Sequence, residues 1–184
     1  MIADILAPFI AVGLAELGDK TQLSILLLSS KTEKHLQLMA GVMLAFLIVD
    51  GFAILVGSWI ANIVPLSLLR IVSGILFIIF GILILRSTGE KDEESRLYTK
   101  IPFISGFLLV FMTEWGDKTQ IASGLFATKY DPVTVLVGTI TALAILTIMA
   151  IYLGRFISTK VDEKSMTKLA GLAFVLIGIS ILLF

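Results

Sequence analysis

The sequence contains one charged heptapeptide twice, first as Glu16-Leu17-Gly18-Asp19-Lys20-Thr21-Gln22 and again, 98 residues later, as Glu114-Trp115-Gly116-Asp117-Lys118-Thr119-Gln120. Six of the seven positions are identical. Each copy lies inside a long apolar stretch, where charged side chains are costly and rare. A charged motif that recurs in such surroundings indicates that the chain consists of two related halves.

Glycines extend this repeat beyond the motif. At a spacing of 97 residues four pairs match, namely Gly41 with Gly138, Gly57 with Gly154, Gly74 with Gly171 and Gly81 with Gly178. One residue of drift in a loop accounts for the change of spacing. We therefore expect a first half over residues 1–90, which includes the start of a linker, and a second half over residues 98–184.

The composition is that of an integral membrane protein. Of the 184 residues, 58% are hydrophobic and 15% are charged, and the mean hydropathy is +1.04. Soluble domains carry about 45–50% apolar and roughly 25% charged residues, so this excess does not fit inside a water-soluble core. The formal net charge is zero, which excludes a basic surface for nucleic acid. Cysteine is absent, which excludes disulfides and thiolate metal sites.

Six stretches reach the length of about 20 apolar residues that a bilayer-spanning helix needs. They are roughly Ile5–Ser29, Leu36–Ala61, Leu66–Leu85, Ile101–Ala127, Pro132–Phe156 and Lys168–Phe184. Three spans in each half is an odd number, so the second half is inverted relative to the first. The sequence thus predicts an all-α integral membrane protein with six transmembrane helices as two inverted three-helix repeats. Secondary transporters commonly have this architecture, with the substrate site near the midplane.

The basic residues predict the orientation. Ten of the 14 Lys and Arg residues fall in the loops between spans 1 and 2, 3 and 4, and 5 and 6, against only Arg70 and Lys129 on the opposite side. Positively charged loops stay in the cytoplasm. We therefore expect these three loops to be cytoplasmic and both termini to lie outside, or in the lumen of an organelle.

Carboxylates inside the predicted spans are the candidate functional residues. Within each motif, Glu and Asp are three residues apart and so share one helix face. The inverted repeat should bring Glu16 and Asp19 opposite Glu114 and Asp117. Four facing carboxylates repel unless a divalent cation, protons or the two motif lysines join them. Because the ligands are hard oxygens and the lone His35 falls in a loop, the site suits Ca²⁺, Mn²⁺ or Mg²⁺.

Neighbouring residues of the motif have supporting roles in this prediction. Thr21, Thr119, Gln22 and Gln120 complete the coordination shell or orient the acids. Gly18 and Gly116 allow a close backbone approach or a local break that frees carbonyl groups. Protons and a dication would compete for the same oxygens, and this competition is sufficient to couple their movements.

The sequence allows two interpretations for each of three further charged residues. Lys20 and Lys118 follow Glu16 and Glu114 by one helical turn, so they are either structural counter-ions or internal cations that move away when metal binds. Asp50 is either a proton relay or a residue that faces a small aqueous pocket.

The duplicated Glu-x-Gly-Asp-Lys-Thr signature resembles that of the transmembrane protein 165 / Gdt family of cation exchangers, in the lysine-exporter superfamily. The resemblance covers essentially the whole chain and implies exchange of Mn²⁺ or Ca²⁺ for protons. The matching motif residues are Glu16, Asp19, Lys20, Thr21, Glu114, Asp117, Lys118 and Thr119. The chain lacks the additional N-terminal segment of eukaryotic members, so it is similar to a minimal prokaryotic form.

The expected protein is therefore an antiporter in the plasma (inner) membrane that exports the metal from the cytoplasm. It is not expected to be an enzyme or to hold a resident cofactor, since the metal ion is its substrate. Its expected partners are the metal ion, protons and lipid. A homodimer is compatible with this architecture, because no large surface extends beyond the membrane.

Alternative functions fit the sequence less well. A divalent-cation channel would not need the inverted repeat, and an exporter of a small organic cation such as a basic amino acid is disfavoured by two lysines in its site. An intramembrane aspartyl protease carries Gly-x-Gly-Asp, whereas here Glu16 and Glu114 occupy the first glycine position. A purely structural membrane subunit would leave the duplicated acids unexplained.

Overall fold

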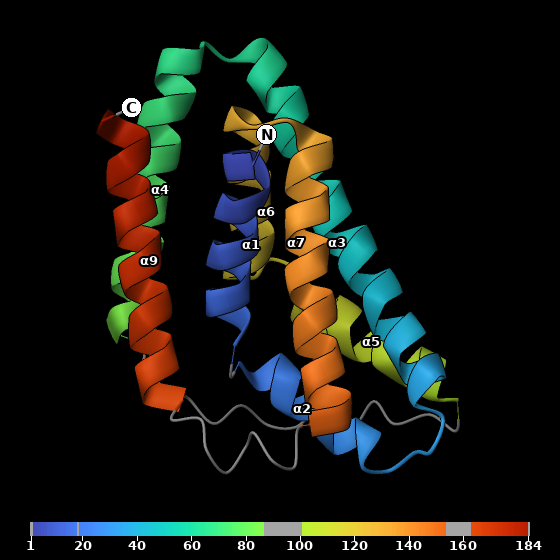
Figure 1. Ribbon diagram of the computed structural model, residues 1–184. Helices are drawn as coiled ribbons and strands as arrows, with labels where there is room; N and C mark the ends of the chain where they lie inside the picture. Colours follow the sequence, from blue (N-terminus) through green and yellow to red (C-terminus); the bar gives the residue numbers. More distant parts are fainter. Residues whose placement is uncertain (1, 18, 87–100, 154–162, 184) are drawn as a thin grey trace.

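The computed structural model describes residues 2–17, 19–86, 101–153 and 163–183, and the regular elements in these ranges are all helical (Figure 1). They are α1 (Ile2–Glu16), α2 (Lys20–Ser29), α3 (His35–Ile63), α4 (Leu66–Arg86), α5 (Pro102–Thr113), α6 (Lys118–Lys129), α7 (Pro132–Ile148), the π-helical η1 (Met149–Leu153) and α9 (Glu163–Leu183). The all-α prediction is confirmed. Most of the predicted central linker, residues 87–100, lies outside the described residues.

Local sequence explains where two helices of the second half begin. Pro102 and Pro132 occupy the first turns of α5 and α7, where the missing N–H of proline leaves no hydrogen bond unmade. Asp131 caps α7, because its Oδ1 accepts hydrogen bonds from the backbone N–H groups of Val133 and Thr134 at 3.1 and 3.0 Å.

Two of the six predicted spans are interrupted. The predicted stretch 5–29 forms α1 and α2, and the predicted stretch 101–127 forms α5 and α6. Both interruptions fall on the heptapeptide motif, between Glu16 and Lys20 and between Thr113 and Lys118. The other stretches contain one helix each, and in the fifth α7 continues into the π-helical turn η1.

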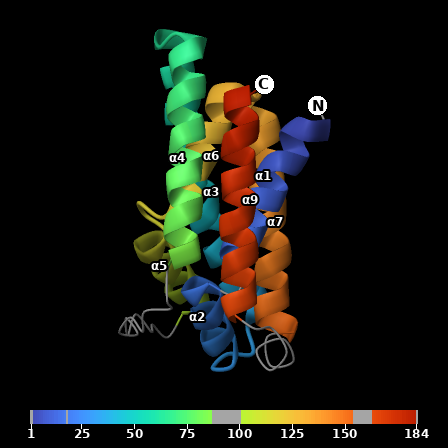
Figure 2. The ribbon, with the colours of Figure 1, turned by 90° about the vertical axis from the view of Figure 1, so that its left-hand side faces the viewer.

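The motif-bearing segments run in opposite directions through the middle of the molecule (Figure 1). Of the remaining helices, α3 packs against α5, α6 and α7, and α1 packs against α7. The antiparallel pair α4 and α9 lies to one side (Figures 1 and 2). Helix α1 begins and α9 ends at the same end of the molecule.

Glycine brings α3 into backbone contact with its neighbours. A Cβ atom at Gly41 would lie 2.0 Å from the carbonyl oxygen of Phe103 in α5, and one at Gly57 would lie 2.0 Å from that of Gly124 in α6. Small residues at helix crossings are typical of proteins in membranes, where close van der Waals packing drives association.

The outer faces of the helices are apolar. Phe52, Leu55 and Trp59 on α3 are each more than half exposed. By length and composition, two of the described helical segments could cross a membrane, His35–Ile63 and Pro132–Tyr152, and shorter apolar helices cover Ser67–Leu83, Pro102–Thr113 and Phe174–Leu183. This surface suits lipid rather than water.

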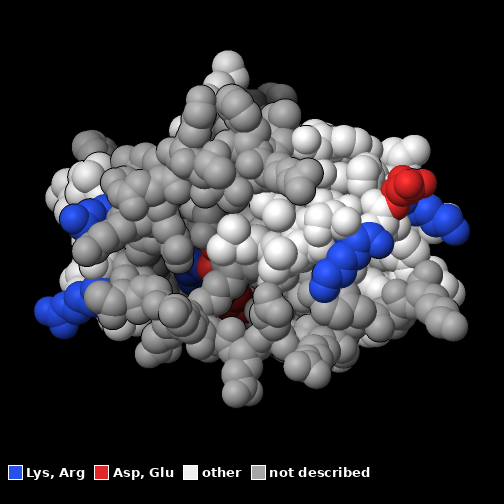
Figure 3. Space-filling model, turned by 90° about the horizontal axis from the view of Figure 1, so that it is seen from below, with Lys and Arg blue, Asp and Glu red and all other residues white. Residues whose placement is uncertain are grey.

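A hollow opens at the end of the molecule where α2 ends and α3 begins (Figure 3). Acidic and basic atoms lie at its bottom. Among the residues of the motif, the side chains of Lys118, Asp19 and Asp117 are 22%, 27% and 31% exposed. The charged centre of the fold is thus partly open to solvent.

Candidate cation site

The described residues of the two motif copies form the same backbone hydrogen bonds. The backbone N–H of Asp19 donates to the carbonyl of Glu16, and that of Asp117 donates to the carbonyl of Glu114, both at 3.1 Å. Each Asp carbonyl then accepts a hydrogen bond at 3.2 Å from the amide four residues later. In both halves the motif therefore ends one helix and begins the next.

Glycine permits this turn in the second copy. Gly116 has φ +86°, a conformation that costs a residue with a side chain about 1–2 kcal/mol. Its N–H donates a 2.6 Å hydrogen bond to Oε1 of Gln120. The local break that the sequence suggested at Gly116 is present, whereas Gly18 lies outside the described residues.

Four helix ends meet at these breaks. The carboxyl ends of α1 and α5 expose carbonyl groups with partial negative charge, which attract cations. The amino ends of α2 and α6 carry partial positive charge, which stabilises the adjoining carboxylates of Asp19 and Asp117. The backbone alone therefore produces a region suited to holding both carboxylates and a cation.

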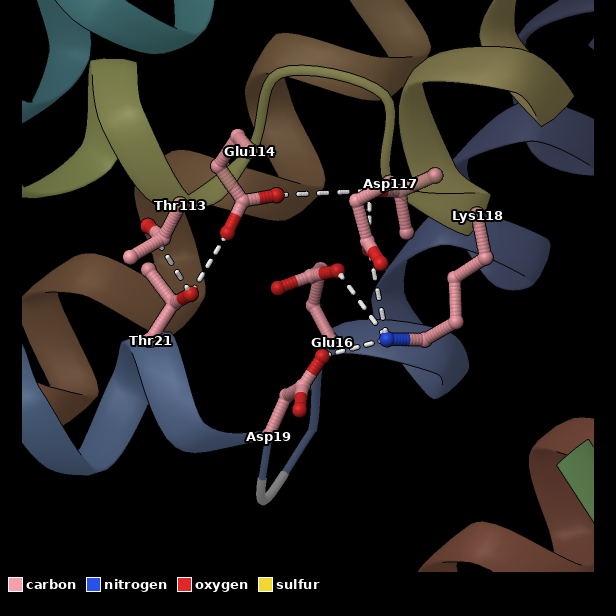
Figure 4. A network of polar contacts seen from close by, with 8 residues as sticks. Glu16, Asp19, Thr21, Thr113, Glu114, Asp117 and Lys118 are labelled. Atoms are coloured by element: carbon pink, nitrogen blue, oxygen red, sulfur yellow. Dashed lines mark hydrogen bonds and ion pairs between the residues drawn. The ribbon is translucent and has the colours of Figure 1, made fainter. Parts of the chain in front are cut away.

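Three carboxylates from both copies converge on one position (Figure 4). Oxygen atoms of Glu16, Asp19 and Asp117 lie within 4.8 Å of one another. The ammonium group of Lys118 lies among them, 3.3 Å from Asp117 Oδ2, 3.9 Å from Glu16 Oε1 and hydrogen-bonded to Asp19 Oδ2. A positive charge thus lies where the oxygen atoms of the three acids converge.

The contacts of Lys118 are relevant to the two interpretations of the motif lysines, as structural counter-ions or as internal cations that move away when metal binds. Within the described residues, the ion pairs of Lys118 reach the acids of the first copy and its neighbour Asp117, not Glu114 one turn earlier. The interruption before α6 removes the helical geometry that the intrahelical pair would need. Lys20 begins α2, and its side chain lies outside the described part of the structure.

Glu114, the fourth acid, is held by hydroxyl groups of both copies. Thr21 Oγ1 donates to Glu114 Oε1 at 2.6 Å, and Thr119 Oγ1 donates at 3.5 Å to Oε2. Thr119 Oγ1 also lies 3.3 Å from Asp117 Oδ2. Both threonines therefore lie beside the acids, where they can orient carboxylates or offer an oxygen to a cation.

The two motif glutamines differ in their surroundings. Gln120 donates from Nε2 to the carbonyl of Val49 at 3.2 Å and accepts at Oε1 from Gly116, so it fixes the break against α3. Gln22 is buried, and neither polar atom of its side chain has a hydrogen-bond partner among the described residues. The carboxylate oxygens of Glu16 also lack hydrogen bonds there. Buried polar atoms without partners are costly, so the side chains of Gln22 and Glu16 each have unused capacity to bind a ligand.

Asp50 forms a separate polar contact on α3. The residue is 2% exposed, and its Oδ1 accepts a 2.9 Å hydrogen bond from Ser123 Oγ of α6. The sequence suggests helix packing rather than ligand binding for the Ser123 hydroxyl group, and Ser123 here forms a hydrogen bond between two helices. It lies one turn after Gln120 on the same helix, so α6 contacts adjacent residues of α3 twice.

Clustered acids between two interrupted, oppositely directed helices in an apolar helical protein are typical of membrane transporters of the secondary type. The chain matches the family described as divalent cation/proton antiporter GDT1 over residues 4–92 and 102–184, and it belongs to this family.

Curated relatives agree with this membership. A Vibrio cholerae protein named "Putative manganese exporter" is 32% identical over 171 residues, which cover 92% of this chain and 85% of that protein. GDT1-like protein 5 of rice is 27% identical, with 90% and 88% covered. A GDT1-like protein of Synechocystis is 26% identical, with 97% and 96% covered. No solved structure matches the chain.

Proposed function

We propose that this protein exchanges Mn²⁺ or Ca²⁺ for protons and exports the metal from the cytoplasm. The observation that carries the proposal is the convergence of Glu16, Asp19 and Asp117, from both motif copies, on one position occupied by the Lys118 ammonium. The family is one of divalent cation/proton antiporters, and one relative is named for manganese export.

The chemistry of the ligands supports a hard dication. Carboxylates and hydroxyl groups are the oxygen ligands that Ca²⁺ and Mn²⁺ accept. We propose Glu16, Asp19, Glu114 and Asp117 as the charged ligands. Thr21, Thr119, Gln22 and Gln120 would complete the shell, Gln120 after exchanging its present hydrogen bonds for the ion.

Competition for the same oxygens couples the two fluxes in this proposal. A dication that enters displaces protons from the carboxylates, and protons that return displace the dication. Lys118 is the third competitor, since its ammonium group pairs with three of the four acids. It would neutralise the empty site and move aside when metal binds, and Lys20 would have the same role in the first copy.

Two sets of contacts support six spans arranged as inverted repeats over residues 1–90 and 98–184. Gly41 packs on Phe103, and the matching Gly138 packs on Ile5, where a Cβ atom would lie 2.4 Å from the carbonyl oxygen. Phe103 and Ile5 are themselves 98 residues apart. When two halves are related by a two-fold axis, each contact between them has a counterpart in which the matching residues come from the opposite halves.

The contacts between helices α4 and α9 are also related to each other by the repeat. A Cβ atom at Gly81 would lie 2.7 Å from the carbonyl oxygen of Gly171, and one at Gly178 would lie 2.7 Å from that of Gly74. Because Gly74 matches Gly171 and Gly81 matches Gly178, each contact is the repeat counterpart of the other. In an alternating-access cycle the two halves would rock about the site between them.

The charge distribution supports a cytoplasmic location for the hollow in Figure 3. That end of the molecule bears the loop with Lys31 and Lys34, while Lys129 lies at the opposite end. Positively charged loops remain in the cytoplasm. The state described here would then be open toward the side from which metal is exported.

Flux through proteoliposomes tests the proposal. Mn²⁺ or Ca²⁺ is added outside vesicles that contain the purified protein and a pH dye, with Asp19→Asn beside the wild type. We expect a dication-dependent pH change that the folded variant abolishes. Metal entry without proton movement would instead support a channel, and no flux at all would direct the next test to a basic amino acid.

A further inference from the structure

We infer that Asp50 is a second proton-carrying group of the exchanger, outside the duplicated motif and present in only one half. The inference rests on the proposed function, since it assigns protons to a residue that the metal-binding acids do not include. The geometry that supports it is the burial of the Asp50 carboxyl group between α3 and α6, with a hydroxyl group as its hydrogen-bond donor.

Among the described side chains, those that interact with Asp50 include acids and no compensating base. Ser123 Oγ donates to Asp50 Oδ1 at 2.9 Å, and the described salt bridges do not include Asp50. Asp117 and Glu114 at the α5–α6 break interact with it electrostatically. A buried carboxylate without a counter-charge is costly, and taking up a proton removes that cost.

The elements around Asp50 add no charge that would replace the proton. Helix α3 itself carries only His35 at its far end besides Asp50. Helices α5 and α7, which pack on α3, contain no charged residue, and α6 contributes only Lys118 and Lys129. The Lys118 ammonium group is already paired with acids of the motif.

A structural connection links Asp50 to the metal-binding turn. Gln120 Nε2 donates to the carbonyl of Val49, next to Asp50, and Gln120 Oε1 accepts from the N–H of Gly116 inside the break. Ser123, one turn further along α6, bonds to Asp50 itself. A movement of the α5–α6 break therefore also changes the surroundings of the Asp50 carboxyl group.

The electrostatic interaction between the bound metal ion and Asp50 determines how metal binding changes the protonation of Asp50. A dication beside Glu114 and Asp117 adds positive charge near Asp50, which favours loss of its proton. Departure of the dication restores the surplus of negative charge, and Asp50 binds a proton again. The matching position in the second half is Thr147, buried and not ionisable, so the two halves differ in this function.

Asp50→Asn provides the main test, because asparagine keeps the shape and the acceptor oxygen but cannot ionise. The purified variant is compared with wild type in proteoliposomes for two activities, namely Mn²⁺ counterflow between equal pH values and proton flux driven by a Mn²⁺ gradient. We expect counterflow within about twofold of wild type and about one proton fewer moved per Mn²⁺, since the motif acids still exchange their own protons. Thr147→Val is the matched control and should change neither activity.

Ser123→Ala provides a second test that does not alter the acid. Loss of the donated hydrogen bond makes ionisation of Asp50 harder, so the pH at which exchange is half-maximal should rise by about one unit. Unchanged proton coupling in Asp50→Asn and an unmoved pH profile in Ser123→Ala would overturn the inference. Equal loss of counterflow and proton flux in folded Asp50→Asn would also overturn it. Absence of exchange in the wild type would refute the proposed function instead.

Discussion

Thr21 Oγ1 donates a 2.6 Å hydrogen bond to Glu114 Oε1, and this bond joins the two copies of the motif across 93 positions of sequence (Figure 4). Thr21 lies in the first turn of α2, whereas Glu114 follows the last residue of α5. Both residues are buried. A hydrogen bond to a charged group contributes about 1.5–3 kcal/mol, so this contact stabilises the arrangement in which the acids of both halves face one another.

Replacement of this threonine should therefore impair exchange. In Thr21→Val the shape is kept but the donor is lost, and among the described side chains Glu114 retains the longer hydrogen bond from Thr119 at 3.5 Å. We expect the initial rate of Mn²⁺ flux in proteoliposomes to fall about tenfold or more, which corresponds to a loss of at least 1.4 kcal/mol.

Two variants provide controls for this prediction. Thr21→Ser keeps the hydroxyl group and should stay close to wild type, and Thr119→Val, which removes a weaker contact, should lose less activity than Thr21→Val. If Thr21→Ser were as inactive as Thr21→Val, the methyl group rather than the hydrogen bond would be the important feature.

Removal of the Lys118 ammonium should tighten metal binding. Lys118 occupies the position between Glu16, Asp19 and Asp117 that a dication would take. Because opposite charges a few ångströms apart interact by several kcal/mol at an effective dielectric constant of about 20, its loss favours the competing metal. We expect Lys118→Met to lower the Kd for Mn²⁺ about tenfold or more in calorimetry of the detergent-solubilised protein.

Lys129→Met is the matched control for this substitution, since Lys129 lies exposed at the end of the same helix. It should leave the Kd unchanged. Weaker Mn²⁺ binding in Lys118→Met would mean that the lysine supports the geometry of the acids instead of competing with the metal.

Much of the fold follows from the sequence because it depends on local composition. The observed helices fall on the six apolar stretches to within about five residues, and a local break is one of the two roles that the sequence allows for the motif glycines, present at Gly116 with φ +86°. The proline positions likewise mark the starts of α5 and α7. These features are determined by a few neighbouring residues.

The partners of the charged side chains could not be predicted in the same way. The sequence left open whether Lys118 pairs with Glu114 one turn earlier, and the structure shows it reaching Asp19 of the other half. The bond between Ser123 and Asp50 joins residues 73 positions apart with no repeating pattern to indicate it. Such contacts depend on how the helices cross, which composition and periodicity do not specify.

Close helix packing gives a prediction about stability. A Cβ atom at Gly57 would lie 2.0 Å from the carbonyl oxygen of Gly124, whereas one at Gly51, on the same helix, would have no neighbour within 4 Å. Gly57→Ala should therefore push α3 away from α6 and destabilise the protein by about 1–3 kcal/mol. Gly51→Ala should be neutral or stabilising by up to about 1 kcal/mol, because alanine favours helix. Thermal unfolding in detergent compares the two variants, and equal melting temperatures would contradict the packing argument.

The turn at Gly116 gives a prediction about activity. A Cβ atom there would meet no atom within 4 Å, so the cost of Gly116→Ala comes from its positive φ and amounts to about 1–2 kcal/mol. We expect the variant to fold, with Mn²⁺ flux reduced several-fold because the turn that carries Glu114 and Asp117 is strained. Gly116→Asn should retain more flux than Gly116→Ala, since asparagine tolerates this conformation better. The opposite order would exclude backbone conformation as the cause.

Competition between protons and metal predicts how binding depends on pH. Carboxylates must lose their protons to bind a metal ion, so acid weakens metal binding and binding releases protons. The Kd for Mn²⁺ should therefore fall as pH rises from about 5.5 to 7.5, by at most about tenfold per pH unit for each proton displaced. Calorimetry in two buffers with different enthalpies of ionisation counts these protons directly. Asp19→Asn removes one charged ligand and should bind Mn²⁺ more weakly at every pH in this range. A Kd that stays constant over this range, with no protons released, would mean that metal and protons do not share the carboxylates, and the exchange mechanism would have to be abandoned.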